Sequence, residues 1–168
     1  VGAISGATTP QTFTINAPSS ITANFAVVSS TSWYSGGGTW TSRKAITIDH
    51  TKVAGSLTNF PALISLTDAN LAGGAKTDGS DIVFTSSDGL TRLNHEIERY
   101  TSATGQLVAW VNIPALSSVG DTIIYLYYGN PAAANQQNAT AVWDSNFKGV
   151  WHFANALTLT DSTGKATA

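Results

Sequence analysis

The chain has 168 residues, is 42% hydrophobic, and carries 8 basic and 10 acidic residues for a formal net charge of −2. This length and apolar share are typical of a globular domain with a sizeable core. The absence of cysteine excludes disulfides and thiolate metal sites. The sequence contains no run of basic residues, which argues against nucleic acid as a partner. No apolar stretch approaches the roughly 20 residues needed for membrane insertion.

The first segment predicts a short β-hairpin. Residues 10–28 alternate apolar and polar side chains, with a turn at Ala17–Ser20. Two strands alone are marginally stable in water, so we expect the hairpin to belong to a larger unit. Together with the absence of methionine, this indicates a piece of a longer protein. The expected boundaries are 1–30 for the hairpin, 31–39 for a Gly/Ser-rich linker, 40–150 for the main module and 151–168 for a partial C-terminal strand and tail.

After the linker, short segments with strand character recur between turn residues. No window of eleven or more residues keeps a helical apolar period without Gly or Pro. Residues 132–147 suit either one short helix or a surface loop. The pattern predicts an all-β fold, an antiparallel β-sandwich of jelly-roll type. The expected strands cover 43–49, 60–66, 81–84, 93–100, 107–113, 122–128 and 149–153.

Six motifs follow one another in the main module. They are Trp40-Thr-Ser-Arg-Lys-Ala-Ile-Thr-Ile, Asn59-Phe-Pro-Ala-Leu-Ile, Gly79-Ser-Asp-Ile-Val-Phe, His95-Glu-Ile-Glu, Ala109-Trp-Val-Asn-Ile-Pro and Tyr127-Tyr-Gly-Asn-Pro. In this order they resemble the bacterial domain of unknown function 2341, over about residues 40–150. The resemblance implies a β-sandwich module of large secreted and surface proteins, often beside sugar-binding modules. It implies no established catalytic activity.

The two flanks resemble other modules. The run Ile21-Thr-Ala-Asn-Phe-Ala-Val is similar to the tail of a divergent internalin-type B repeat. The stretch from Gly149-Val-Trp-His-Phe to Asp161-Ser-Thr-Gly looks like the opening strand of a concanavalin A-like (laminin-G-like) module. These resemblances imply that the chain is an internal fragment of a larger surface protein. The neutral, hydroxyl-rich, thiol-free composition also favours an extracellular or cell-surface location.

Glu96 and Glu98 form the sharpest acidic pair. Residues i and i+2 of a strand share one face, which brings the carboxylates within the range that glycoside hydrolases use. The alternative is that one carboxylate pairs with Arg43, Lys44 or Arg99 while the other is solvated. Because carboxylate pairs on strands are commonly structural, the sequence favours a non-catalytic role.

Metal sites have weaker signals. His50, His95 and His152 lack the spacing of a zinc or copper motif. Asp78, Asp81 and Asp88 lie in or beside Gly-containing turns, where their oxygens suit a structural Ca²⁺ ion. The alternative is that Asp78 and Asp88 make turns by bonding their own backbone. The sequence therefore offers Asp78, Asp81 and Asp88 as candidate ligands of one structural Ca²⁺ ion, the one cofactor that it indicates.

Aromatic side chains provide the leading functional hypothesis. Sugar rings stack their C–H faces on Trp and Tyr, while amides and charged groups bind the hydroxyls. Tyr125 and Tyr127 share one predicted strand face, and Tyr128 takes the other. The alternative for any single aromatic is packing in the core. The candidate ligand-binding residues are Trp33, Tyr34, Trp40, Tyr125, Tyr127 and Asn130.

The sequence therefore favours a non-catalytic extracellular module that binds a polysaccharide or glycan, or mediates adhesion. A second hypothesis is a structural subunit of an adhesin or filament, in which the N-terminal strands at 10–28 pair with the sheet edge of another copy of the chain or of a neighbouring domain. A third is a glycan-active hydrolase that uses Glu96 and Glu98.

Overall fold

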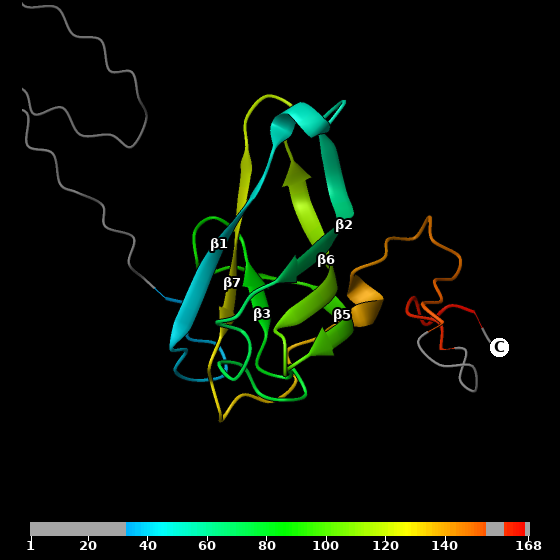
Figure 1. Ribbon diagram of the computed structural model, residues 1–168. Helices are drawn as coiled ribbons and strands as arrows, with labels where there is room; N and C mark the ends of the chain where they lie inside the picture. Colours follow the sequence, from blue (N-terminus) through cyan, green and yellow to red (C-terminus); the bar gives the residue numbers. More distant parts are fainter. Residues whose placement is uncertain (1–32, 154–159, 167–168) are drawn as a thin grey trace, which may run out of the picture.

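The computed structural model describes residues 33–153 and 160–166, and their strands form two antiparallel sheets (Figure 1). This arrangement confirms the prediction of an all-β sandwich. The predicted hairpin at 10–28 lies outside the described residues. The strands are β1 (Ser42–Ile48), β2 (Leu57–Thr67), β3 (Val83–Thr85), β4 (Arg92–Leu93), β5 (His95–Thr101), β6 (Gln106–Leu116) and β7 (Thr122–Tyr128), with 3-10 turns η1 (His50–Lys52) and η2 (Ala139–Ala141).

One sheet has the strand order β1-β7-β3-β4, and the other has the order β2-β6-β5. Strands β6, β7 and β3 are internal, because each pairs with a neighbour on both sides. Strands β1 and β2 each form an edge, and Figure 1 shows η1 linking them at one end of the sandwich. A long strand edge of this kind offers unpaired backbone groups.

The core lies between the sheets and follows from strict alternation in the central strands. Every second residue of β6 from Leu107 to Ile113 is buried, and β7 contributes Ile124, Leu126 and Tyr128 to the same cluster. Since β-branched and aliphatic side chains suit a half-buried pleated surface, these runs form strands and bury one face each. Burial of each such side chain contributes about 1.5–3 kcal/mol relative to exposure.

Two predicted strands differ from the observed ones. The run 93–100 is divided at Asn94 into β4 of one sheet and β5 of the other, so this segment carries the chain between layers. Residues 149–153 form no strand. There the backbone of Val150 is bonded by Asp161 and Ser162 of the following segment, and Phe153 has a left-handed φ of 52°.

Candidate functional site

The outer face of the four-stranded sheet gathers most of the predicted aromatic residues. Arg43 of β1 pairs with Tyr127 of β7, and Tyr125 lies two residues before Tyr127 on the same face. Tyr128 belongs instead to the core between the sheets. The predicted division of the three tyrosines between two faces is therefore confirmed.

Tyr127 lies beneath the other aromatic side chains of this face and is fully buried. Its hydroxyl donates to the Gly89 carbonyl at 2.9 Å. Its ring centroid lies 5.6 Å from that of Trp33, 6.2 Å from Tyr34 and 6.5 Å from Trp40. Such edge-on and tilted aromatic contacts favour a rigid arrangement. Tyr127 therefore supports the face and does not itself offer a ring to a ligand.

Two other predicted ligand residues are also structural. Trp40 is 4% exposed, and its indole N–H donates to the Gly36 carbonyl at 2.9 Å. Asn130 is 2% exposed; its amide donates to the Gly37 carbonyl and its oxygen accepts from the Ala132 N–H. The prediction that Trp40, Tyr127 and Asn130 contact a ligand is corrected here, because the Gly-rich turn before β1 covers them.

That turn positions the exposed part of the site. Gly37 and Gly38 have positive φ angles of 78° and 116°, a backbone conformation that side-chain-bearing residues rarely adopt. The turn closes through a hydrogen bond from Gly38 N–H to the Ser35 carbonyl. It places Trp33, 40% exposed, edge-on to the Tyr127 ring. Residues 33–39 thus pack on the sheet, although the sequence suggested a linker.

Arg43 joins the exposed aromatics and was missed as a binding residue. Its guanidinium carbon lies 4.5 Å from the ring centroid of half-buried Tyr125 and 5.2 Å from that of Trp33. One of its nitrogens donates to the Tyr127 hydroxyl at 3.2 Å. A guanidinium over aromatic rings gains cation–π attraction. The signal was hidden because only the β1–β7 register brings Arg43 beside the tyrosines.

A second arginine lies on the same face. The register aligns Ala45, Tyr125, Thr85 and Arg92 in one row across all four strands. Arg92 is exposed. Neither Arg92 nor Arg43 makes an ion pair within residues 33–153 and 160–166. The face therefore combines exposed aromatic surface with two positive charges.

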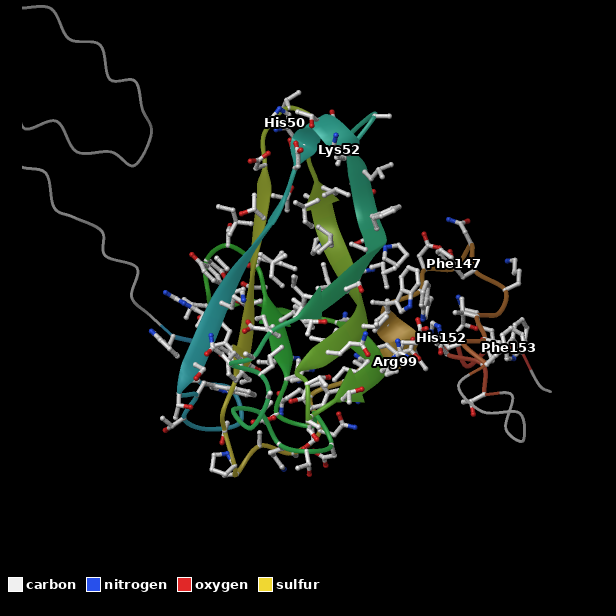
Figure 2. All side chains as sticks on the ribbon, viewed as in Figure 1. His50, Lys52, Arg99, Phe147, His152 and Phe153 are labelled. Carbon is white, nitrogen blue, oxygen red and sulfur yellow. The ribbon has the colours of Figure 1, made fainter. Side chains whose placement is uncertain are left out.

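Glu96 and Glu98 lie on the outer face of the other sheet, where a histidine separates them. His152 Nε2 is 3.3 Å from a Glu96 oxygen, and His152 Nδ1 is 3.2 Å from a Glu98 oxygen. The first contact is an ion-pair distance that lacks hydrogen-bond geometry. Figure 2 shows His152 and Phe147 on the C-terminal segment beside β5. The register shift between Ile97 and Arg99 does not separate the two carboxylates onto opposite sides.

Two tryptophans complete this acidic cluster. Trp110 of β6 donates its indole N–H to Glu98 at 2.8 Å, and Trp143 donates to Glu96 at 3.0 Å. Ser162 also donates to Glu96. The predicted pairing of these glutamates with arginine or lysine is therefore replaced by contacts with indoles and His152. The cluster holds the C-terminal segment on the sheet, and the imidazole occupies the space that a glycosidase substrate would need between its carboxylates.

The structure places the three predicted calcium ligands in separate local networks. Asp81 is 1% exposed and accepts backbone N–H groups from Lys76, Gly129 and Asn130. Asp78 accepts from the Ser80 N–H. Asp88 bonds residues of its own turn, chiefly Thr91, which holds the pKa of its carboxyl far below the usual range.

These three aspartates do not form one cluster. Within the described ranges, the group of three His, Asp or Glu side chains with metal-ligand spacing is Asp49, His50 and Asp121, beside η1. Figure 2 shows His50 at that end of the sandwich. A site made jointly by Asp78, Asp81 and Asp88 is thus not supported by the geometry, while calcium binding by the protein stays a prediction.

An apolar pocket, also missed from the sequence, lies between the η1 loop and β2. Its volume is about 440 Å³. Asn59 of β2 has a left-handed φ of 50°, and Leu57 pairs with buried Leu116 in the register that β2 keeps along β6. Leu57, Phe60 and Leu63 remain 42%, 39% and 50% exposed. The lining residues are Ile48, Lys52, Val53, Ala54, Gly55, Ser56, Leu57, Phe60, Ala62, Leu63 and Leu116.

The two antiparallel sheets and the core between them define this chain as a β-sandwich module. Residues 78–160 match the family described as domain of unknown function (DUF2341), which confirms that part of the resemblance. The match spans just under half of the chain, from before β3 to beyond η2. The resemblances of the two flanks stay predictions.

Comparisons with curated proteins and with solved structures each found no match. No helix among the described residues has the length and apolar character required for a membrane crossing.

Proposed function

We propose that this chain is a non-catalytic carbohydrate-binding module and that it binds glycan on the outer face formed by Trp33, Arg43 and Tyr125, here called the aromatic–arginine face. The observation that carries the proposal is the exposure of Trp33 beside Tyr125 and the Arg43 guanidinium. Aromatic surface suits the C–H face of a sugar, and guanidinium N–H groups suit its hydroxyls.

The fixed position of buried Tyr127 beneath the exposed rings supports this proposal. The contacts of Tyr127 with Trp33, Tyr34 and Trp40, and its hydrogen bond to Gly89, hold the exposed rings in place before any ligand arrives. A site that is already ordered loses less conformational entropy on binding, so more of the contact energy appears as affinity. The hydroxyl-rich, cysteine-free composition supports an extracellular role in a bacterial surface or secreted protein.

Depletion of the protein from solution by insoluble polysaccharides, with affinity electrophoresis in soluble ones, tests the proposal. We expect Trp33→Ala to weaken binding about fivefold, because a stacking contact on an aromatic ring is worth about 1 kcal/mol. Trp151→Ala is the matched control, since Trp151 is 38% exposed on the C-terminal segment. Equal losses in both variants, or no binding to any glycan, would contradict the proposal.

The polysaccharide mixtures used for the binding test are also assayed for released reducing ends. Catalysis would appear as product formation that Glu98→Gln abolishes, and would make the protein a glycan hydrolase. Because His152 lies between Glu96 and Glu98, we expect no product to form.

A second candidate function is assembly by strand addition, favoured by the apolar pocket beside β1 and β2, which are edge strands among the described residues. An added strand would cover Leu57, Phe60 and Leu63. We expect Leu63→Asp to abolish any concentration-dependent oligomer seen by sedimentation. Leu90→Asp, at a residue with 49% exposure on the turn before β4, should leave it intact. A chain that stays monomeric at all concentrations would exclude this role.

A further inference from the structure

We infer that the aromatic–arginine face selects a carboxylated polysaccharide, one containing uronic acid units, over a neutral one. This inference rests on the proposed function, that the face binds glycan, and adds the chemical class of the ligand. Its basis is the placement of Arg43, which has no acidic partner among the described residues, beside the rings of Trp33, Tyr125 and Tyr127.

Arg43 is half-buried and has a charge that the described residues leave unneutralised. The acid–base contacts found in those residues join Lys44 to Asp68, His50 to Asp121, and His152 to the two glutamates of β5. A partly desolvated cation gains more from a nearby anion than a cation in bulk water does. Arg43 is therefore a favourable place for a ligand carboxylate.

The hydrogen-bond capacity of Arg43 points the same way. A guanidinium carries five N–H donors, and within the described ranges one nitrogen of Arg43 has an acceptor, the Tyr127 hydroxyl. The remaining donors form a planar fork that matches the two oxygens of a carboxylate. A flat carboxylate extends the plane of the guanidinium, whereas a sugar hydroxyl accepts with one oxygen and carries no charge.

The second cation suits a polymer of repeating acidic units. Arg92 lies on β4, three strands from β1, a separation of roughly 14 Å in the hydrogen-bonding direction. Tyr125 lies between the two arginines. A chain that crosses the strands would therefore meet Arg43, the Tyr125 ring and then Arg92.

The acidic residue of the adjoining turn is Asp88. Its two carboxylate oxygens accept hydrogen bonds from Ser86, Leu90 and Thr91 within that turn. These bonds direct its oxygens to donors of its own turn, and the two arginines outnumber it. The balance of charge on the face therefore favours an anionic ligand.

The test compares one polymer in two forms, polygalacturonate and the same polymer after chemical reduction of its carboxyl groups. Binding of the full chain is measured by calorimetry in EDTA, so that calcium does not bridge protein and ligand. We expect the acidic form to bind at least about tenfold more tightly, since a charge-assisted bidentate contact is worth more than a neutral one.

Variants assign the preference to Arg43. Arg43→Gln should abolish the preference for the acidic form and leave residual binding of the reduced form. Arg43→Lys, which retains charge without the fork, should retain part of the preference. Arg99→Gln is the matched control, because Arg99 is exposed on β5 of the other sheet. Thermal unfolding of each variant confirms that it folds.

The outcomes separate the inference from the proposed function. Equal binding of both forms that Trp33→Ala abolishes would overturn the inference and leave glycan binding standing. Binding of neither form nor of any other glycan would overturn both. Dextran sulfate bound as tightly as polygalacturonate through Arg43 would also overturn the preference for carboxylate, because the face would then accept any oxyanion.

Discussion

Asp81 joins three parts of the chain through one buried carboxylate. It accepts from the backbone of Lys76, which precedes β3, and from Gly129 and Asn130, which follow β7. Three N–H groups, that of Asn130 buried and the other two partly buried, therefore depend on a single side chain, and each would be costly to leave unpaired. The residue predicted as a calcium ligand thus connects loops at one end of the four-stranded sheet.

Replacing this carboxylate tests its structural role. Asp81→Ala should lower the free energy of unfolding by about 2–4 kcal/mol, because it leaves buried and partly buried donors without an acceptor. Urea denaturation in EDTA measures the change without any contribution from calcium. Asp78→Ala is the control and should lose much less, because exposed Asp78 accepts one N–H, from Ser80. A loss below about 1 kcal/mol for Asp81→Ala would contradict this role.

His95 is a buried histidine in the core, where its ring packs edge-on against Phe84 at 5.3 Å. Burial lowers its pKa to about 4, an effect that the contact of its Nδ1 with the Leu93 carbonyl only partly offsets. The unfolded chain has an ordinary histidine pKa of about 6.5. Between these values the unfolded state binds a proton that the folded state does not.

Stability should therefore fall as the solution is acidified from pH 7 to pH 5. The expected loss is about 2 kcal/mol, because each pH unit inside the window contributes up to about 1.4 kcal/mol. Denaturant unfolding at both pH values measures it. His95→Gln, which has no titrating ring, should show a flatter profile over the same range. A wild-type profile that is flat from pH 7 to pH 5 would show that His95 is accessible to protons.

At the scale of elements, one residue of β2 adopts a backbone conformation that few residue types tolerate. Asn59 adopts a φ of 50°, where β-branched residues are strongly disfavoured. Asn59→Gly should preserve stability to within about 0.5 kcal/mol, and Asn59→Val should lose about 1–2 kcal/mol. Thermal unfolding compares the two variants. Equal stability of both would mean that β2 adopts an extended conformation at this position.

The C-terminal segment is held on β5 and β6 through Glu96 and Glu98. Glu96→Ala removes the acceptor of Trp143 and Ser162 and one neighbour of His152. We expect amide exchange to accelerate in 143–153, with a local opening energy lower by about 1–3 kcal/mol, and little change in β6 and β7. Arg99→Ala, on the same strand, is the control. Uniform acceleration throughout the sandwich would instead make this segment part of the global folding unit.

At the scale of the whole molecule, an ion pair joins an edge strand of one sheet to the end of an edge strand of the other. Lys44 of β1 contacts Asp68, the residue after β2, and this contact holds the pKa of Asp68 below its usual value. Its contribution is therefore present at neutral pH and lost as the pH falls below about 4. Lys44 is 47% exposed, which screens the pair.

A double-mutant cycle of Lys44→Gln and Asp68→Asn measures this connection. We expect a coupling of about 1 kcal/mol at pH 7, in the upper range for a partly exposed pair, and a smaller value at pH 3 or in 1 M salt. Urea unfolding of the four proteins provides the four free energies. A coupling of zero at neutral pH would mean that apolar burial alone holds the sheets together.

The all-β architecture and the assignment of core residues in β6 and β7 follow from the sequence alone. Leu107 to Ile113 and Ile124 to Tyr128 alternate, and a strand that buries one face must repeat with a period of two. The same rule correctly placed Tyr125 and Tyr127 opposite Tyr128, and brought Glu96 and Glu98 to one side.

Only the tertiary structure decided which of these side chains remain accessible. Alternation assigns a residue to a face but does not show what covers that face, so Tyr127 and Trp40 could not be distinguished from Trp33 in advance. The pairing of Arg43 with Tyr127, the insertion of His152 between two glutamates and the pocket beside β2 join segments far apart in the chain. Local sequence has no signal for such contacts, because strand order and loop packing are settled by the burial of the whole molecule.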